Sequence, residues 1–104
     1  MGLFRRRPRS SGGEPISDSK AARTHLQQFA STRRGVEAYV EPPTNVTAPT
    51  IVLVAWDGEW TRRAVRTRDE AFELGKTLGV PTYDVQATGY PSRMREWTSR
   101  QRKR

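Results

Sequence analysis

Cysteine is absent from the 104-residue chain. Its absence excludes a disulfide framework, a thiolate metal site and a cysteine nucleophile, and it suits a reducing cytoplasm, where we expect the protein to lie. Histidine occurs once, at His25, so the ligands for a zinc site are missing as well. No G-x-G-x-x-G or P-loop spacing occurs. The sequence therefore predicts neither a bound metal nor a cofactor.

Long apolar runs are absent too. The longest covers residues 51–56, far short of the roughly 20 residues that a membrane span needs. The basic cluster near the N-terminus is not followed by the apolar segment of a signal peptide. Hydrophobic residues make up 34% of the chain and its mean hydropathy is −0.84, both low for a chain packed throughout. We expect no membrane span and one small domain, monomeric, with part of the chain unstructured.

Positive charge is in excess, and it gathers at the two ends. The net charge is +8, and 16 of the 19 basic residues are arginine. Residues 1–35 carry 8 basic and 2 acidic side chains, residues 36–90 carry 5 and 8, and residues 91–104 carry 6 and 1. Cations gathered on both sides of an acid-leaning middle are typical of polyanion-binding arms on a small core. A GC-rich genome would also favour arginine everywhere, so the arginine preference alone decides nothing.

Hydrophobic periodicity predicts two helices in the middle of the chain. The first covers residues 18–34, with Arg33 and Arg34 in its last turn and Gly35 ending it. The second starts at a capping box over residues 67–70 and ends at Gly79. Their apolar stripes are Ala22, Leu26, Phe29 and Ala30 in the first helix, and Ala71, Leu74, Gly75 and Leu78 in the second.

Three strands are expected between these helices. Residues 36–41 alternate apolar and polar, residues 51–56 form an uninterrupted β-rich run, and residues 60–65 return after an Asp-Gly turn. A two-residue turn would pair Ala55 with Trp60 and would point the first two tryptophans to opposite faces of the sheet.

The pattern as a whole predicts an α+β fold in the order α-β-β-β-α, a three-stranded antiparallel sheet with helices on one face. Residues 82–87 can add a short fourth strand. We expect a disordered basic arm over residues 1–17, a small α+β domain over residues 18–90 and a basic helical tail over residues 91–104. Tyr90, the residue just before that tail, shares one helical stripe with Met94 and Trp97 of the tail.

Two resemblances accompany this pattern. The runs GVEAYVEP at 35–42, VLVAWDGEWTRR at 52–63, GVPTYDV at 79–85 and GYPSRMR at 89–95 look like a group of small, uncharacterised basic actinobacterial proteins, some of which carry a generic oxidoreductase label. That likeness implies a shared core and no catalytic residue. The element order also resembles that of double-stranded-RNA-binding domains. However, the loop over 41–46 lacks that family's histidine, and its lysine cluster is replaced by a net acidic segment over 67–70.

Residue types that suit catalysis are few, and each has a simpler interpretation. We interpret His25 as a residue at the edge of a helix's apolar stripe. Asp57 and Glu59 are interpreted as a solvated turn, not as an acid–base pair. Trp56 and Trp60 either cover one side of the sheet or form an aromatic platform beside Arg62 and Arg63.

The strongest functional signal is the set of cations at the two ends, which suit phosphate contacts. They are Arg5, Arg6, Arg7, Arg9, Arg93, Arg95, Arg100, Arg102, Lys103 and Arg104. The full set of predicted nucleic-acid contacts adds Arg33, Arg34, Arg62, Arg63 and the interleaved aromatics Tyr90 and Trp97.

Our leading hypothesis is a non-catalytic nucleic-acid-binding accessory protein, with RNA favoured over DNA and ribosomal RNA as the expected site. The alternative is a protein-interaction adaptor that docks its partner through the hairpin or a helix face. A small oxidoreductase is a distant third. Solubilising tails, or arms that touch an anionic membrane surface, remain alternative interpretations of the basic ends.

Overall fold

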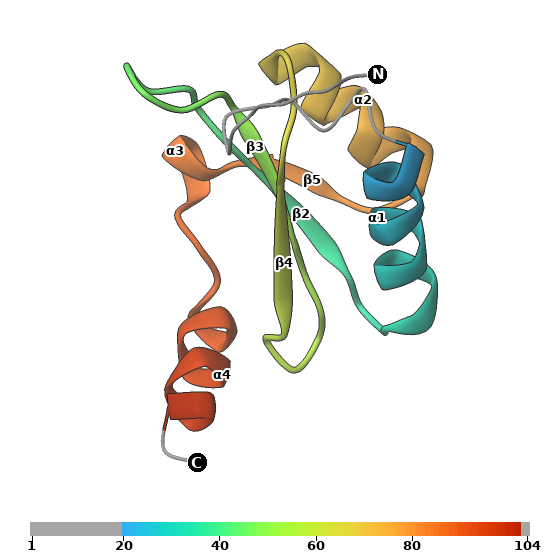
Figure 1. The fold of residues 1–104 in the computed structure, drawn as a ribbon. Coiled ribbons are helices and arrows are strands. Elements are labelled where there is room, and N and C mark those ends of the chain that lie inside the picture. The colour runs from blue at the N-terminus through green and yellow to red at the C-terminus, as the bar shows by residue number, and fades with distance from the viewer. Residues whose placement is uncertain (1–19, 103–104) are drawn as a thin grey trace, which may run out of the picture.

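The structure, a computed structural model, describes residues 20–102 and has the α+β fold that the sequence predicts (Figure 1). The predicted arm over residues 1–17 lies outside the described residues, as do Lys103 and Arg104. The elements in chain order are α1 (Lys20–Thr32), β2 (Glu37–Glu41), β3 (Thr50–Val54), β4 (Trp60–Ala64), α2 (Arg68–Leu78), β5 (Thr82–Asp84), α3 (Val85–Thr88) and α4 (Ser92–Arg102).

Four strands form one mixed sheet in the order β4-β3-β2-β5. The three predicted strands make its antiparallel part, since β3 pairs antiparallel with both β2 and β4. The short fourth strand, β5, is parallel to β2. A parallel neighbour needs a long connection, and here the chain returns to the sheet through α2 (Figure 1).

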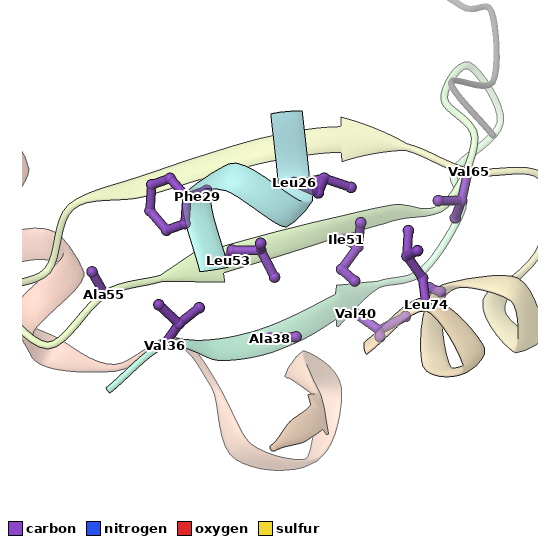
Figure 2. Packing of buried hydrophobic residues seen from close by; sticks show 11 residues of the cluster. Leu26, Phe29, Val36, Ala38, Val40, Ile51, Leu53, Ala55, Val65 and Leu74 are labelled. Atoms are coloured by element: carbon purple, nitrogen blue, oxygen red, sulfur yellow. The ribbon is translucent and has the colours of Figure 1, made fainter. Parts of the chain in front are cut away.

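The main core lies between this sheet and the helices α1 and α2 (Figure 2). Alternation along the strands places Ala38 and Val40 of β2 on the same face as Leu53 and Ile51 of β3, because these residues are direct cross-strand partners. The buried residues of this cluster are Leu26, Phe29, Val36, Ala38, Val40, Ile51, Leu53, Ala55, Val65, Ala71 and Leu74. The apolar stripes predicted for α1 and α2 therefore pack against this face of the sheet.

α1 ends two residues earlier than the sequence predicts. Its last residue is Thr32, and Arg33 then leaves the helix to pair with Glu59 at 2.8 Å. The carbonyl of Arg34 accepts a hydrogen bond from the backbone N–H of Trp56, at 2.9 Å. The helix end is thus held by the β3–β4 hairpin.

α2 begins and ends as predicted, with a modified capping box. The Thr67 hydroxyl accepts the backbone N–H of Glu70 at 3.0 Å, while the Glu70 carboxylate accepts the N–H of Arg66 at 2.8 Å. The reciprocal bond therefore reaches one residue further back than the usual pattern. At the other end Gly79, with φ 75°, takes the left-handed conformation that closes a helix.

The β3–β4 turn is longer than predicted, and the predicted pairing is wrong. Val54, not Ala55, is the partner of Trp60. The N–H of Gly58 donates to the carbonyl of Ala55 at 2.9 Å and the N–H of Ala55 donates to that of Glu59 at 2.8 Å. This is the pattern of a three-residue loop that ends on a glycine of positive φ, here 96°. Trp56 therefore lies in the loop and not on a strand face.

The second face of the sheet is covered as well. Tyr39 and Val52 are buried there, and Met94 of α4 packs against them. The sequence assigned Tyr39 to a polar, solvent-facing side and the C-terminal segment to a tail. In the structure α4 instead lies against this face, opposite to α1 and α2 (Figure 1).

Candidate functional site

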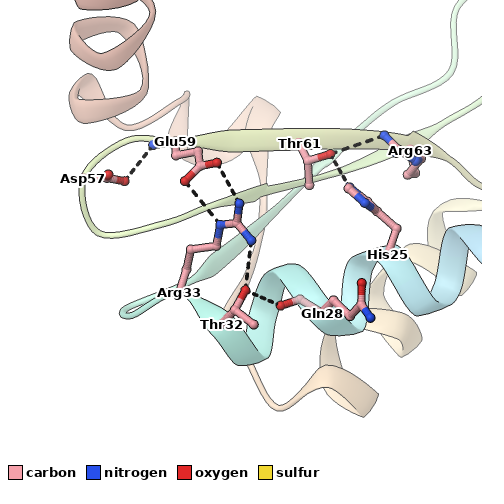
Figure 3. Close-up of polar contacts among 8 residues, drawn as sticks. All are labelled: His25, Gln28, Thr32, Arg33, Asp57, Glu59, Thr61 and Arg63. Atoms are coloured by element: carbon pink, nitrogen blue, oxygen red, sulfur yellow. Dashed lines mark hydrogen bonds and ion pairs between the residues drawn. The ribbon is translucent and has the colours of Figure 1, made fainter.

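The residues weighed for catalysis hold the hairpin in place. His25 shares a hydrogen bond of 2.9 Å with the hydroxyl of Thr61 (Figure 3). Burial lowers its pKa, and the nearby Arg63 and Arg33 lower it further. The carboxylate of Glu59 accepts hydrogen bonds from Nε and Nη2 of Arg33, at 3.2 and 2.8 Å (Figure 3). Among residues 20–102 no group of three histidines or carboxylates could hold a metal ion.

The first of two acidic anchors on β2 is Glu37. Its Oε1 accepts a hydrogen bond from Arg93 of α4 at 2.7 Å and one from the Tyr39 hydroxyl at 3.0 Å. Burial alone would raise the pKa of Glu37, but these two bonds outweigh it and hold the pKa below its ordinary value. Burial, together with the bond to Glu37, raises the pKa of Tyr39 to about 12. The charge of Arg93 is therefore neutralised within the chain.

The second anchor is Glu41. Its two oxygens accept Nε and Nη2 of Arg62, each at 2.9 Å, which is the bidentate geometry of a strong pair. Thr50 and Tyr90 also donate their hydroxyls to this carboxylate. Burial would raise the pKa of Glu41, yet the three donors hold it below its ordinary value. Glu41 thus fixes the residue that precedes Pro91 and α4.

A few specific contacts hold α4 against the β3–β4 hairpin, although no residue of α4 is fully buried. Besides Glu37, the guanidinium of Arg93 donates from Nε to the carbonyl of Ala55 at 2.9 Å. The indole N–H of Trp60 donates to the hydroxyl of Thr98 at 3.0 Å. Gly58 comes so close to α4 that a Cβ there would lie 1.9 Å from the carbonyl oxygen of Arg93 and 2.8 Å from Cβ of Trp97. Trp97 is thereby packed against the hairpin.

The side of α4 that faces away from the hairpin carries arginines without partners among residues 20–102. Arg95 and Arg102 are exposed, and neither makes a hydrogen bond or an ion pair with another residue in the part of the chain that the structure describes. They border a cleft of about 220 Å³ whose lining is completed by Tyr90, Pro91, Met94 and Thr98. No acidic residue lines the cleft. We call this surface the α4 cleft.

A second exposed cationic spot lies at the hairpin tip. Trp56 is 62% exposed, and the guanidinium carbon of Arg34 lies 5.7 Å from its ring centroid. Arg100 of α4 donates to the carbonyl of Asp57 at 3.0 Å. Of the two tryptophans expected beside Arg62 and Arg63, Trp60 has the guanidinium carbon of Arg62 5.2 Å from its ring centroid. Trp56 instead lies beside Arg34, and Arg100 binds the next residue of the loop.

The sixteen predicted contact residues fall into three groups. Arg33, Arg62, Arg93, Tyr90 and Trp97 make the internal contacts described above. Arg34, Arg63, Arg95, Arg100 and Arg102 have no carboxylate partner among residues 20–102. Arg5, Arg6, Arg7, Arg9, Lys103 and Arg104 lie outside the described residues.

Sequence reasoning missed the anchoring role of Glu37 and Glu41. The available signal was their position: both alternate with buried residues on one side of a strand, in a chain whose C-terminal segment is basic. Which arginine each carboxylate takes depends on contacts across 56 positions for Glu37 and 21 for Glu41. Such long-range pairing cannot be deduced from local pattern.

No helix among residues 20–102 has both the length and the apolar character needed to cross a bilayer. Comparison with protein-family models, with curated proteins and with solved structures finds no match for the chain. Function must therefore be argued from the α4 cleft and the hairpin tip themselves.

Proposed function

We propose that this chain is a non-catalytic accessory protein that binds nucleic acid, with RNA favoured over DNA, through the α4 cleft and the basic segments at both ends. One observation carries the proposal: Arg95 and Arg102 border an apolar-floored cleft with no acidic neighbour in its lining. Ribosomal RNA in the cytoplasm is the target that we favour.

The chemistry of the cleft suits a nucleotide strand. Guanidinium groups bind phosphate oxygens through paired N–H donors, and each phosphate contact gains affinity by releasing condensed counterions. The floor supplies the ring of Tyr90 and the side chain of Met94, which offer an apolar surface for a base or a sugar. Phosphate contact and apolar contact are thus available within one cleft.

The internally paired arginines have another role in this account. Arg93 and Arg62 neutralise Glu37 and Glu41 on the second sheet face. The Arg93–Glu37 pair ties α4 to β2, and Glu41, which Arg62 neutralises, also binds Tyr90 just before α4. We infer that these pairs position the binding surface and that phosphate contact falls to Arg95 and Arg102.

The test is a charge-matched pair of double variants. The change R95Q/R102Q removes both cations of the cleft, and R23Q/K76Q removes two exposed cations from α1 and α2. Both leave the same net charge, so only location differs. We expect R95Q/R102Q to weaken binding to a short RNA more than tenfold at moderate salt, and R23Q/K76Q to weaken it less than threefold. Equal losses in the two variants would show that total charge, and not the cleft, determines binding.

Co-purification separates this function from the adaptor alternative. A complex held by RNA falls apart when the lysate is treated with nuclease, whereas a protein partner docked on the hairpin stays bound. We expect nuclease to release whatever co-purifies with the full chain. Partners that persist after complete RNA digestion would favour the adaptor.

A further inference from the structure

Trp56 is exposed at a place where the fold does not require an aromatic residue. Within residues 20–102 three large hydrophobic side chains are exposed, at 88% for Val46, 62% for Trp56 and 47% for Tyr90. Val46 lies in the β2–β3 loop, and Tyr90 is tied to Glu41 by its hydroxyl. Among residues 20–102, Trp56 is therefore the most exposed aromatic side chain that is open to a ligand.

The backbone beneath Trp56 is firmly held. Its N–H donates to the carbonyl of Arg34, and its Cβ lies 3.2 Å from where a Cβ of Gly35 would stand. On the other side of the loop, Asp57 accepts the N–H of Glu59 through its side chain at 3.0 Å, and Gly58 abuts the backbone of α4. An aromatic ring on a fixed loop loses little conformational entropy when a ligand stacks on it.

The charge around Trp56 indicates the kind of ligand. Arg34 lies over part of the ring, and Arg100 reaches the neighbouring peptide carbonyl. Arg33 differs from both, because Glu59 neutralises it. The acidic group of the loop, Asp57, uses its carboxylate to cap the turn. An aromatic ring with one arginine over it, and a second arginine bound to the next residue of the loop, suits a planar group that carries an anion, and a nucleotide has both parts.

From this geometry we propose that the hairpin tip, defined as Arg34, Trp56 and Arg100, is a stacking site for an unpaired nucleobase, so that the chain prefers single-stranded RNA to duplex RNA. The inference rests on the proposed function and deepens it. In a duplex the bases are stacked on one another and offer no free face, whereas bases in single strands and loops can be splayed onto an aromatic side chain. The indole supplies selectivity for unpaired bases, and the arginines supply attraction for any phosphate.

The experiment compares three probes on the full chain: a single-stranded oligouridylate, an RNA duplex of equal length, and heparin, a polyanion without bases. The variants are Trp56→Leu, which keeps an apolar side chain, Trp56→Phe, which keeps an aromatic ring, and Val46→Ala as a matched exposed control. For Trp56→Leu we expect about tenfold weaker binding to oligouridylate and less than twofold change for duplex and heparin. Trp56→Phe should retain most of the affinity, and Val46→Ala all of it.

Salt dependence gives a second readout. Trp56→Leu should leave the slope of log affinity against log salt unchanged, because no phosphate contact is lost. Arg100→Gln should reduce that slope by about 0.7, the value for one phosphate on a single strand. If Trp56→Leu binds oligouridylate as tightly as the unaltered chain, or loses heparin and oligouridylate equally, the stacking site is refuted. Failure of the proposed function looks different: the unaltered chain would then ignore oligouridylate and heparin alike.

Discussion

Replacing Gly58 by alanine tests the docking of α4 more sharply than any deletion. The added Cβ would stand 1.9 Å from the carbonyl oxygen of Arg93 and 2.8 Å from Cβ of Trp97. The nearest atom belongs to backbone, so no rotamer change can relieve the overlap. Either α4 withdraws from the hairpin or the loop distorts. Removing residues 91–104 would also undock α4, but it takes away the arginines at the same time.

The expected cost follows from what α4 loses when it withdraws. A residue with a Cβ at positive φ costs about 1–2 kcal/mol. Losing the charge-assisted bond from Arg93 to the partly exposed Glu37 costs about 1–2 kcal/mol. Losing the hydrogen bond from Arg93 to the carbonyl of Ala55, together with the Trp60–Thr98 bond, costs about 1 kcal/mol more. We expect Gly58→Ala to lower the free energy of unfolding by about 4 kcal/mol, a large share of a small domain's stability.

Gly79→Ala is the matched control. Gly79 has φ 75°, yet a Cβ there would meet no atom within 4 Å, so the change costs backbone strain alone, about 1–2 kcal/mol. Urea denaturation followed by circular dichroism gives the two free energies, and hydrogen exchange in α4 reports its docking. Faster exchange throughout α4 is expected for Gly58→Ala only. If both variants lowered the free energy of unfolding equally and left α4 equally protected from exchange, the packing of Gly58 against α4 would be refuted.

Three further predictions concern stability. Thr67→Ala removes the cap of α2 and should lower the free energy of unfolding by about 1 kcal/mol in urea; no change would contradict the capping bond. Because the pKa of His25 is lowered in the folded chain, the unfolded chain binds a proton at a higher pH than the folded chain does. The free energy of unfolding should therefore fall as the pH drops below about 6.5. His25→Gln should make this fall shallower. The Tyr39 hydroxyl should titrate at about pH 12 in ultraviolet absorbance, later than an ordinary tyrosine. Its contribution to stability is complete below pH 10 and lost towards pH 12. Burial and the bond to Glu41 raise the pKa of Tyr90 as well, so Tyr39→Phe should shrink the late absorbance change without abolishing it, and a late phase of undiminished amplitude would contradict the assignment.

Local chemistry explains why much of the fold could be predicted. The stripe containing Leu26 and Phe29 predicts α1, and alternation around Ala38 and Val40 predicts β2, because side-chain period alone decides which face is buried. The threonine cap and Gly79 mark both ends of α2. These features depend on residues a few positions apart.

The remaining features depend on contacts between distant residues. The pattern Asp57-Gly58 favours a two-residue turn, but the loop is one residue longer and Gly58 lies against Arg93 of α4. Tyr39 resembles a solvent-facing residue until Met94 covers it. The division of the arginines into paired and unpaired sets depends on Glu37, Glu41 and Glu59, whose partners are 56, 21 and 26 positions away.

The most direct test of the central claim is the affinity of the full chain for a single-stranded RNA, measured across a salt series from low to moderate ionic strength. The account predicts tight binding at low salt, a steep linear fall of log affinity with log salt, and a slope that drops by about 1.4 in R95Q/R102Q, since each phosphate on a single strand contributes about 0.7. Binding that is absent at the lowest salt, or a slope that these two substitutions leave unchanged, would contradict it.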